Sequence, residues 1–210
     1  MKERPIPFTP ANVRAILDGR KTQTRRVMKS QPYTLRVEGF GYPTKAGGFV
    51  SLQSPHCLSE CPYGVPGDRL WVKETFQPIF APYVRREDAD WETGKGYAPR
   101  YTATEGRTEW VDADDNITDR CKPAIFMPRW ASRITLEIEE VRVERVQEMS
   151  EYDAKEEGTG VWFESHPHEE WDGDPDQYRK GYKELWDSIN LKSHPWASNP
   201  WVFAITFKRI

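Results

Sequence analysis

The sequence predicts a mixed α+β fold, and three observations support this prediction. The chain of 210 residues suits one domain with large loops, or at most two small domains. Short amphipathic helical patterns alternate with segments in which apolar residues recur at every second position, as in half-buried strands. The elements follow the order strand, helix, strand, more strands, helix, helix, strand, which fits an α+β architecture. We therefore expect a single domain over residues 1–210.

The first helix is the best-marked element of the chain. Thr9 is a suitable N-cap, Pro10 suits the first helical position, and an apolar stripe follows. Gly19 stands where a helix C-terminus favours a residue with a left-handed backbone. Residues 22–27 are then compatible with a strand. The sequence thus predicts a helix, a sharp turn and a strand over residues 9–27.

The turn and the start of this strand concentrate cations and hydroxyl groups. Arg20 and Lys21 are expected at the bend, and Thr24 follows three residues after the lysine. A lysine held among arginines has its ammonium form disfavoured, so its pKa falls toward the range of a general base. A threonine hydroxyl becomes a nucleophile when such a base takes its proton. Strict strand alternation would send Lys21 and Thr24 to opposite faces, so their cooperation requires Lys21 to lie in the bend.

The alternative for the same segment is a solvated edge strand, because sheet edges are commonly protected by charge. If Lys21 serves catalysis, Lys21→Ala is expected to leave stability nearly intact, as a surface substitution would. Lys and Arg number 30 against 33 Asp and Glu, so the net charge is −3 and attraction to RNA requires a local basic patch. That patch would consist of Arg20, Lys21, Arg25 and Arg26.

A strand is predicted over residues 70–75, and its alternation places Glu74 on the same face as Leu70 and Val72. A carboxylate on an apolar face is costly unless it is paired or hydrogen-bonded. Two interpretations follow. Glu74 either forms a salt bridge with an arginine or is a site carboxylate that faces Lys21.

Further strands and a long helix are predicted in the C-terminal half. Residues 132–146 alternate as a strand, with a one-residue shift near 139–140 that indicates a β-bulge. Residues 200–210 form another alternating strand. Between them, a helix that starts near Asp174 carries an apolar packing stripe that includes Tyr182, to which we assign no chemistry.

A short helix after residue 149 ends in an unusual way. Ser150 caps it, with Asp153 three residues on in a capping-box position. Glu156 and Glu157 lie at its C-terminus, where the helix macrodipole disfavours negative charge. A local conflict of this kind indicates a role beyond stability.

Two segments are predicted to be long loop insertions, at about residues 29–62 and 76–122. The first is rich in Gly, Pro, Ser and Tyr, with one strand expected near residues 34–37. The second is rich in Pro, Gly and acidic residues, with one weak strand expected at 97–104. Segments of this length in a compact domain are usually functional or disordered.

Several of these residues form a pattern that is similar to the signature of the ASCH family: Gly19-Arg20-Lys21-Thr22-x-Thr24-x-Arg26. Residues 63–74, 127–133 and 199–203 resemble the longer ASCH proteins of phage and prophage genomes. The resemblance implies a small PUA-like β-barrel with flanking helices, associated with RNA. It also implies relatedness to bacterial N4-acetylcytidine amidohydrolases.

By this resemblance the chain is expected to hydrolyse an acylated cytidine-type nucleoside, with Lys21, Thr24 and Glu157 as catalytic residues. Glu156 is the alternative to Glu157. Residues expected to bind substrate or line the site are Arg20, Arg26, Trp71, Glu74, Arg129, Trp130 and Ser132. Two other functions stay open: a non-catalytic RNA-binding module, because PUA-like barrels typically read RNA, and a metal-dependent ribonuclease.

The remaining expectations concern location and cofactors. The N-terminus lacks an apolar signal segment and no run approaches membrane-spanning length, so we expect a cytoplasmic protein without a membrane partner. We also expect a monomer. Cys57, Cys61 and Cys121 suit neither a disulfide framework nor a paired zinc knuckle, so no metal or other cofactor is expected.

Overall fold

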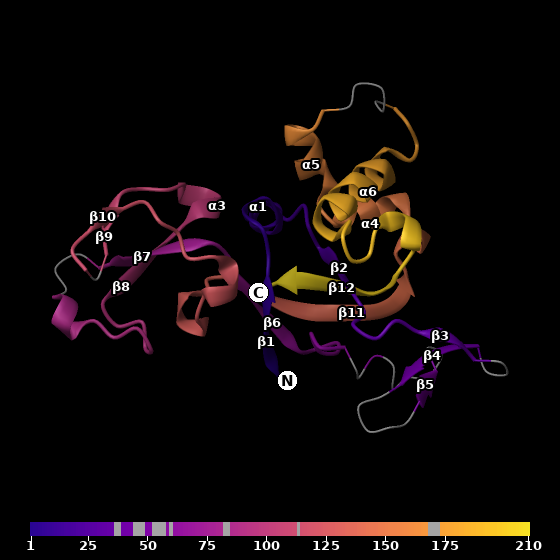
Figure 1. Ribbon diagram of the computed structural model, residues 1–210, viewed down its shortest axis with the longest axis horizontal. Coiled ribbons are helices and arrows are strands. Elements are labelled where there is room, and N and C mark those ends of the chain that lie inside the picture. The colour runs from indigo at the N-terminus through magenta and orange to yellow at the C-terminus, as the bar shows by residue number, and fades with distance from the viewer. Residues whose placement is uncertain are drawn as a thin grey trace.

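A computed structural model describes residues 1–35, 39–43, 49–51, 58, 61–81, 85–112, 114–167 and 173–210. Its centre is a five-stranded sheet in the order β1-β6-β11-β12-β2 (Figure 1). Only β1 and β6 pair in parallel, and the other neighbours are antiparallel. The strands are β1 (Glu3–Pro7), β6 (Arg69–Lys73), β11 (Thr135–Arg145), β12 (Trp201–Arg209) and β2 (Gln23–Val27).

This sheet is open within the described ranges, because β1 and β2 are its two edges and no ladder joins them. The mixed α+β class is therefore confirmed, whereas closure into a barrel is not shown. The predicted bulge is confirmed by a register shift between Ile138 and Glu140, where β11 pairs with β12.

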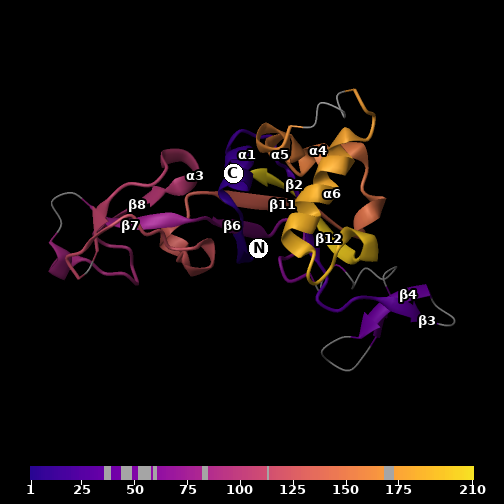
Figure 2. The ribbon, with the colours of Figure 1, turned by 45° about the horizontal axis from the view of Figure 1, so that its top comes forward.

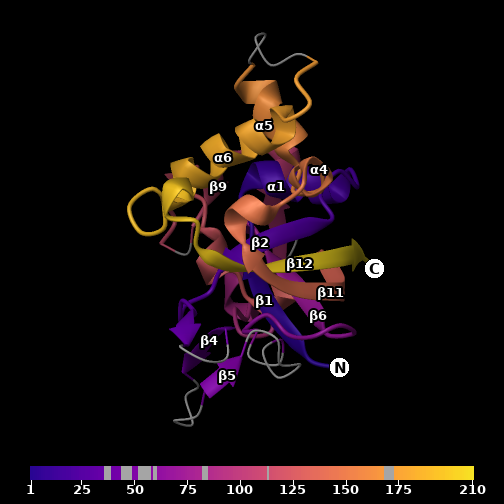
Figure 3. The ribbon, with the colours of Figure 1, turned by 90° about the vertical axis from the view of Figure 1, so that its right-hand side faces the viewer.

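In Figure 3 the helices α1, α4, α5 and α6 lie above the strands β2, β12 and β11. Their bounds are α1 (Pro10–Leu17), α4 (Glu151–Glu156), α5 (Thr159–Ser165) and α6 (Gln177–Asn190). Thr9 caps α1, and Ser150 with Asp153 forms the predicted capping box of α4. Helix α5 was not predicted. No helix in the described ranges has both the length and the apolar surface that crossing a membrane requires.

Two apolar clusters hold these layers together. The larger lies among α1, β1, β6, β11 and β12, where Phe203, Ile205 and Phe207 of β12 are buried on one face. Val202, one position along, joins a second cluster with Tyr182 and Trp186 of α6. Both faces of β12 are therefore buried. Alternation along the strand sends Phe203, Ile205 and Phe207 to the cluster that includes α1, and Val202 to the cluster that includes α6.

The two expected insertions contain more strands than predicted (Figures 1 and 2). Segment 29–62 forms the sheet β3-β4-β5, and segment 76–122 contains the pairs β7-β8 and β9-β10 together with α3. Their bounds are β3 (Tyr33–Leu35), β4 (Gly39–Pro43), β5 (Phe49–Ser51), β7 (Phe76–Phe80), β8 (Tyr97–Tyr101), α3 (Thr102–Glu105), β9 (Trp110–Val111) and β10 (Ile117–Thr118). The strand expected at 97–104 is confirmed as β8, but the expectation that it is the only strand in 76–122 is wrong, because Pro78 obscures β7 in the sequence. Pro78 lies opposite Pro99 in a two-stranded ladder, where an edge tolerates proline.

Gly158 makes the junction between α4 and α5 possible. Its φ is +80°, and a Cβ at this position would lie 3.2 Å from the Cβ atoms of both Ala15 and Lys21. The junction thus needs a residue without a side chain, and it fixes how closely α4 approaches Lys21.

We expect Gly158→Ala to lower the free energy of unfolding by about 1–2 kcal/mol, because a left-handed backbone is unfavourable for alanine. The tight contacts with Ala15 and Lys21 act in the same direction. Gly160→Ala is the matched control, since its Cβ would meet nothing within 4 Å and alanine favours the helix. Urea denaturation measures both variants, and equal effects would contradict this account of the junction.

Candidate active site

Lys21 lies in the bend between α1 and β2, ahead of the strand. Gly19 has a φ of +72°, and the backbone N–H groups of Arg20 and Lys21 both donate to the carbonyl of Ala15, at 2.8 and 3.1 Å. Strand β2 begins only at Gln23. Lys21 therefore lies before the strand, so strand alternation does not determine the direction of its side chain, which is buried.

The Lys21 ammonium group meets the end of α4. Its Nζ donates to the carboxylate Oε2 of Glu157 at 2.7 Å and to the Glu157 carbonyl at 2.6 Å. Both residues are only 3% exposed. Glu157 is the C-cap of α4, so the lysine satisfies a carbonyl that the helix leaves unpaired and offsets the acid at this end of the dipole.

The second carboxylate oxygen of Glu157 contacts two other groups. Its Oε1 accepts from Nη1 of Arg25 at 3.2 Å and from the hydroxyl of Tyr182 at 3.5 Å. Arg25 also donates from Nε to Glu144 at 2.8 Å, and its Nη2 lies 3.6 Å from Asp153. Glu157 is thus held between two cations in the interior, as a buried carboxylate requires.

The environment changes the acidity of two side chains here. Burial lowers the pKa of Lys21 below its ordinary value, although the nearby charge of Glu157 opposes this shift; Arg26 and Arg25 lower it further. Burial and the charge of Glu157 raise the pKa of the Tyr182 hydroxyl well above its ordinary value. Lys21 therefore loses its proton at a lower pH than a free lysine does, and Tyr182 stays a hydrogen-bond donor.

Lys21, Thr24 and Glu157 line one cleft of about 220 Å³, which we call the Lys21 cleft. Its other polar walls include Arg25, Arg26 and Tyr182, and its apolar walls include Phe8, Leu185 and Trp186. The Thr24 side chain is buried and its hydroxyl has no hydrogen-bond partner among the described residues. Arg26 donates from Nη2 to the carbonyl of Pro7 at 2.7 Å, and its guanidinium lies 5.1 Å from the Phe8 ring centre.

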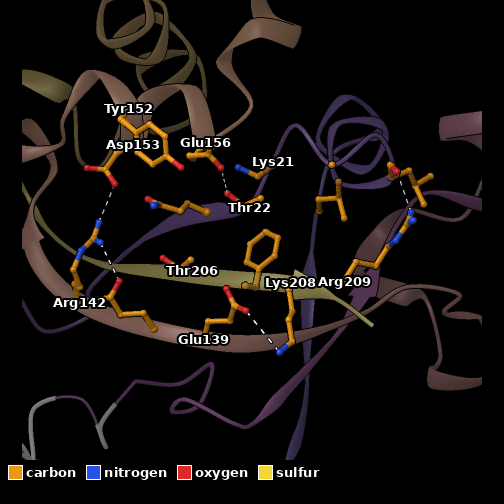
Figure 4. Close-up of a pocket in the computed structure, with 16 residues that line it drawn as sticks. Lys21, Thr22, Glu139, Arg142, Tyr152, Asp153, Glu156, Thr206, Lys208 and Arg209 are labelled. Atoms are coloured by element: carbon orange, nitrogen blue, oxygen red, sulfur yellow. Dashed lines mark hydrogen bonds and ion pairs between the residues drawn. The ribbon is translucent and has the colours of Figure 1, made fainter.

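The carboxylates of Glu156 and Glu157 bind different partners. The Glu156 carboxylate accepts from the hydroxyl of Thr22, and the Glu156 carbonyl accepts from the Thr22 N–H at 2.9 Å. Both residues line a second cleft, on which Figure 4 is centred. Of the two acids considered from sequence, Glu157 is the one that contacts Lys21.

Glu74 does not line the Lys21 cleft. Its carboxylate accepts from Nε and Nη2 of Arg133 at 2.9 and 3.0 Å, and the Arg133 guanidinium lies 3.9 Å from the Tyr101 ring centre. The salt-bridge interpretation of Glu74 therefore describes the structure, because Arg133 neutralises this almost fully buried acid.

The other expected substrate-binding residues also lie outside the Lys21 cleft, except Arg26. Arg20 is exposed and pairs with Asp18 and Glu164. Arg129 pairs with Glu3, and its guanidinium lies 6.0 Å from the Trp71 ring centre.

Trp130 and Ser132 have structural contacts on the flank that carries β7 and β8. The indole of Trp130 donates to the Trp91 carbonyl at 2.7 Å, within an apolar cluster that includes Phe76 and Met127. The Ser132 hydroxyl donates to the Val72 carbonyl at 2.8 Å, which ties the start of β11 to β6. These contacts arise from pairings that the residue types alone do not reveal.

The basic patch expected from sequence does not form as a surface. Lys21 and Arg25 are buried and paired with carboxylates, and Arg20 is paired at the surface. Sequence reasoning also missed Tyr182 as a site residue, because its position on the apolar stripe of α6 resembles that of the packing residue Trp186. Nothing in the stripe marks the hydroxyl that reaches Glu157.

In the described part of the chain, no group of three His, Cys, Asp or Glu side chains is arranged to hold a metal ion. Cys57 lies outside the described residues, whereas Cys61 is buried and Cys121 half-buried. No protein-family model, no curated protein and no solved structure matches this chain.

The burial of Lys21 changes the expected effect of removing it. Lys21→Ala was expected to leave stability nearly intact, but the side chain is buried and ion-paired, so that expectation does not fit the structure. We now expect Lys21→Met to lower the free energy of unfolding by about 3 kcal/mol, because Glu157 loses one of its two buried cations.

Arg20→Met is the matched control, since Arg20 is an exposed ion-paired cation and such pairs contribute about 0–1 kcal/mol. Chemical denaturation of Lys21→Met, Glu157→Gln and the double variant completes the test. The double variant should lose less than the sum of the single losses. Strict additivity would show that the two side chains do not depend on each other.

Proposed function

We propose that this chain is an ASCH-type hydrolase that removes the acyl group from the exocyclic amine of a cytidine-type nucleoside. The proposal includes a PUA-like origin for the central sheet, in keeping with the sequence resemblance. One observation carries it: a buried lysine of lowered pKa, a buried glutamate and a threonine hydroxyl that has no partner among the described residues line the same small cleft. These are the groups that acyl transfer from nitrogen to water requires.

In the first step, Thr24 attacks the acyl carbonyl carbon of the substrate. Unprotonated Lys21 takes the proton from the Thr24 hydroxyl as the new C–O bond forms. The C–N bond then breaks, and the departing amine needs a proton. Lys21 and Glu157, joined by a 2.7 Å hydrogen bond, form a relay that can supply it.

In the second step, water hydrolyses the acyl ester of Thr24. The relay of Lys21 and Glu157 takes a proton from the attacking water and returns one to the Thr24 oxygen. The products are a carboxylic acid and the nucleoside with a free amine, so one water is consumed for each amide cleaved. Arg26 lines the cleft as a hydrogen-bond donor suited to the negative charge on the carbonyl oxygen.

The charges of the cleft favour a small neutral substrate over a polyanion. Lys21 and Arg25 are neutralised by Glu157 and Glu144, so they attract phosphate weakly. Arg26 is the cation of the cleft that makes no ion pair within the described ranges. The small volume likewise suits a single base-sized group with a short acyl chain.

The purified protein is expected to convert N4-acetylcytidine to cytidine and acetate, measured by chromatography of the nucleosides. Thr24→Val should lose at least about 100-fold in kcat/KM, and Thr24→Ser, which keeps the hydroxyl, should stay within about tenfold. Thermal unfolding of both variants controls for folding.

The same preparation separates the two alternatives. Addition of EDTA should not change nucleoside turnover, whereas EDTA-sensitive cleavage of labelled RNA would favour a ribonuclease. Retention of RNA without turnover of acylated nucleosides would favour a binding module. Either result would overturn the proposed hydrolase.

The pH dependence of the reaction follows from the lowered pKa of Lys21. A general base acts in its unprotonated form, so kcat/KM should rise with pH and level off below pH 10.5, the ordinary pKa of lysine. Arg26→Gln removes a positive charge that lowers the pKa of Lys21, so it should move the rising limb to higher pH. A limb that stays in place in this variant would contradict Lys21 as the base.

A further inference from the structure

A larger cleft lies beside the Lys21 cleft, on the side of α4 that carries Glu156. Its volume is about 740 Å³, and its walls come from the end of α1, the start of β2, the middle of β11, the end of β12 and α4 (Figure 4). We call it the Thr22 cleft. Lys21 lines both clefts, but its Nζ is bound to Glu157, so the proposed hydrolysis makes no use of the Thr22 cleft.

Two cations of the Thr22 cleft are already engaged by carboxylates. Arg142 donates to Glu140 at 3.1 Å and to Asp153 at 3.0 Å, and it also contacts Glu144. Figure 4 shows Arg142 directed at Asp153 on one wall of the cleft and Lys208 directed at Glu139 at its lower edge. A third cation of the cleft, Arg209, donates to the Leu17 carbonyl at 3.0 Å. Because these three cations already have acceptors in the protein, we look for a ligand that is recognised without a phosphate.

Gln23 places a hydrogen-bond donor in this cleft. Its side-chain oxygen accepts from Nη1 of Arg25 at 3.4 Å, and arginine has only donors, so the amide orientation is fixed. The Gln23 nitrogen Nε2 is left without a partner among the described residues, although the side chain is only 6% exposed and lines the cleft. This nitrogen is therefore free to donate to a ligand that enters the cleft.

Glu156 supplies acceptors in the same cleft. One oxygen of its carboxylate accepts from Thr22, and the other has no partner in the described ranges. Tyr152, one turn earlier on α4, is 67% exposed, and its ring lies next to Glu156 above the cleft (Figure 4). Phe207 also lines the cleft and is almost fully buried.

We propose that the Thr22 cleft binds a guanine base. The carboxylate of Glu156 accepts from the adjacent N1–H and N2–H groups of guanine, and Nε2 of Gln23 donates to its O6. The exposed ring of Tyr152 provides a surface for stacking. Adenine and cytosine each present one exocyclic amine as the donor on this edge, and uracil presents one N–H, so they match a carboxylate acceptor less well.

Calorimetric titration of the unsubstituted protein with nucleosides tests the proposal without disturbing the fold. Guanosine should bind at least tenfold more tightly than inosine, which lacks only the exocyclic amine, and more tightly than adenosine or cytidine. GMP should bind within about threefold of guanosine, with little dependence on salt, because the cations of the cleft are engaged.

Variants locate the site. Glu156→Gln and Gln23→Leu should each weaken guanosine binding at least tenfold, whereas Glu164→Gln on α5, outside the cleft, should not change it. Thr24→Val should also leave guanosine binding unchanged, so this proposal and the proposed hydrolase can fail separately.

Equal binding of inosine and guanosine, or no guanosine binding at millimolar concentration, would overturn the proposal. So would a strong, salt-sensitive preference for GMP over guanosine, which would indicate a phosphate site. Thermal unfolding identifies any variant that does not fold, and the nucleoside series on the unsubstituted protein then decides by itself.

Discussion

The buried carboxylate of Glu157 joins the helical layer to the central sheet. It accepts hydrogen bonds from Lys21 before β2 and from Arg25 within β2, while its backbone ends α4. Arg25 continues to Glu144 on β11 and approaches Asp153 on α4. Removing such charges from water costs several kcal/mol for each ion, so every member must face a partner. This requirement fixes where α4 lies on β2 and β11.

Stability alone is a weak reason for such a cluster, because well-packed apolar residues often stabilise an interior equally well. The acid also stands at a helix C-terminus, where the dipole disfavours it. Two unfavourable choices at one position indicate that the chemical properties of Glu157 and Lys21 matter in themselves. The same end of α4 directs Glu156 to Thr22, so neighbouring acids of one helix serve two clefts.

Local signals allowed much of the fold to be predicted, and long-range pairing set the rest. The cap at Ser150, the bulge near Glu140 and the turn at Gly19 each depend on a few neighbouring residues, and each is present. The burial of Lys21 depends on Glu157, which is 136 residues away in the chain. The same holds for Glu74, whose partner Arg133 was not identifiable among the arginines of the sequence. Charged residues near a turn look exposed unless their distant partners are known.

Arg25 connects the two clefts through a single nitrogen atom. Its Nη1 donates both to Oε1 of Glu157, in the Lys21 cleft, and to the side-chain oxygen of Gln23, in the Thr22 cleft. The groups offered on the two sides nevertheless differ. The Lys21 cleft is lined by an amine of lowered pKa and by a hydroxyl that has no partner in the described part of the chain, and both suit reaction. The Thr22 cleft holds engaged cations, a carboxylate and an amide nitrogen, which suit recognition by hydrogen bonding. The same guanidinium group of Arg25 therefore orients the Gln23 amide in the Thr22 cleft and neutralises the Glu157 carboxylate in the Lys21 cleft.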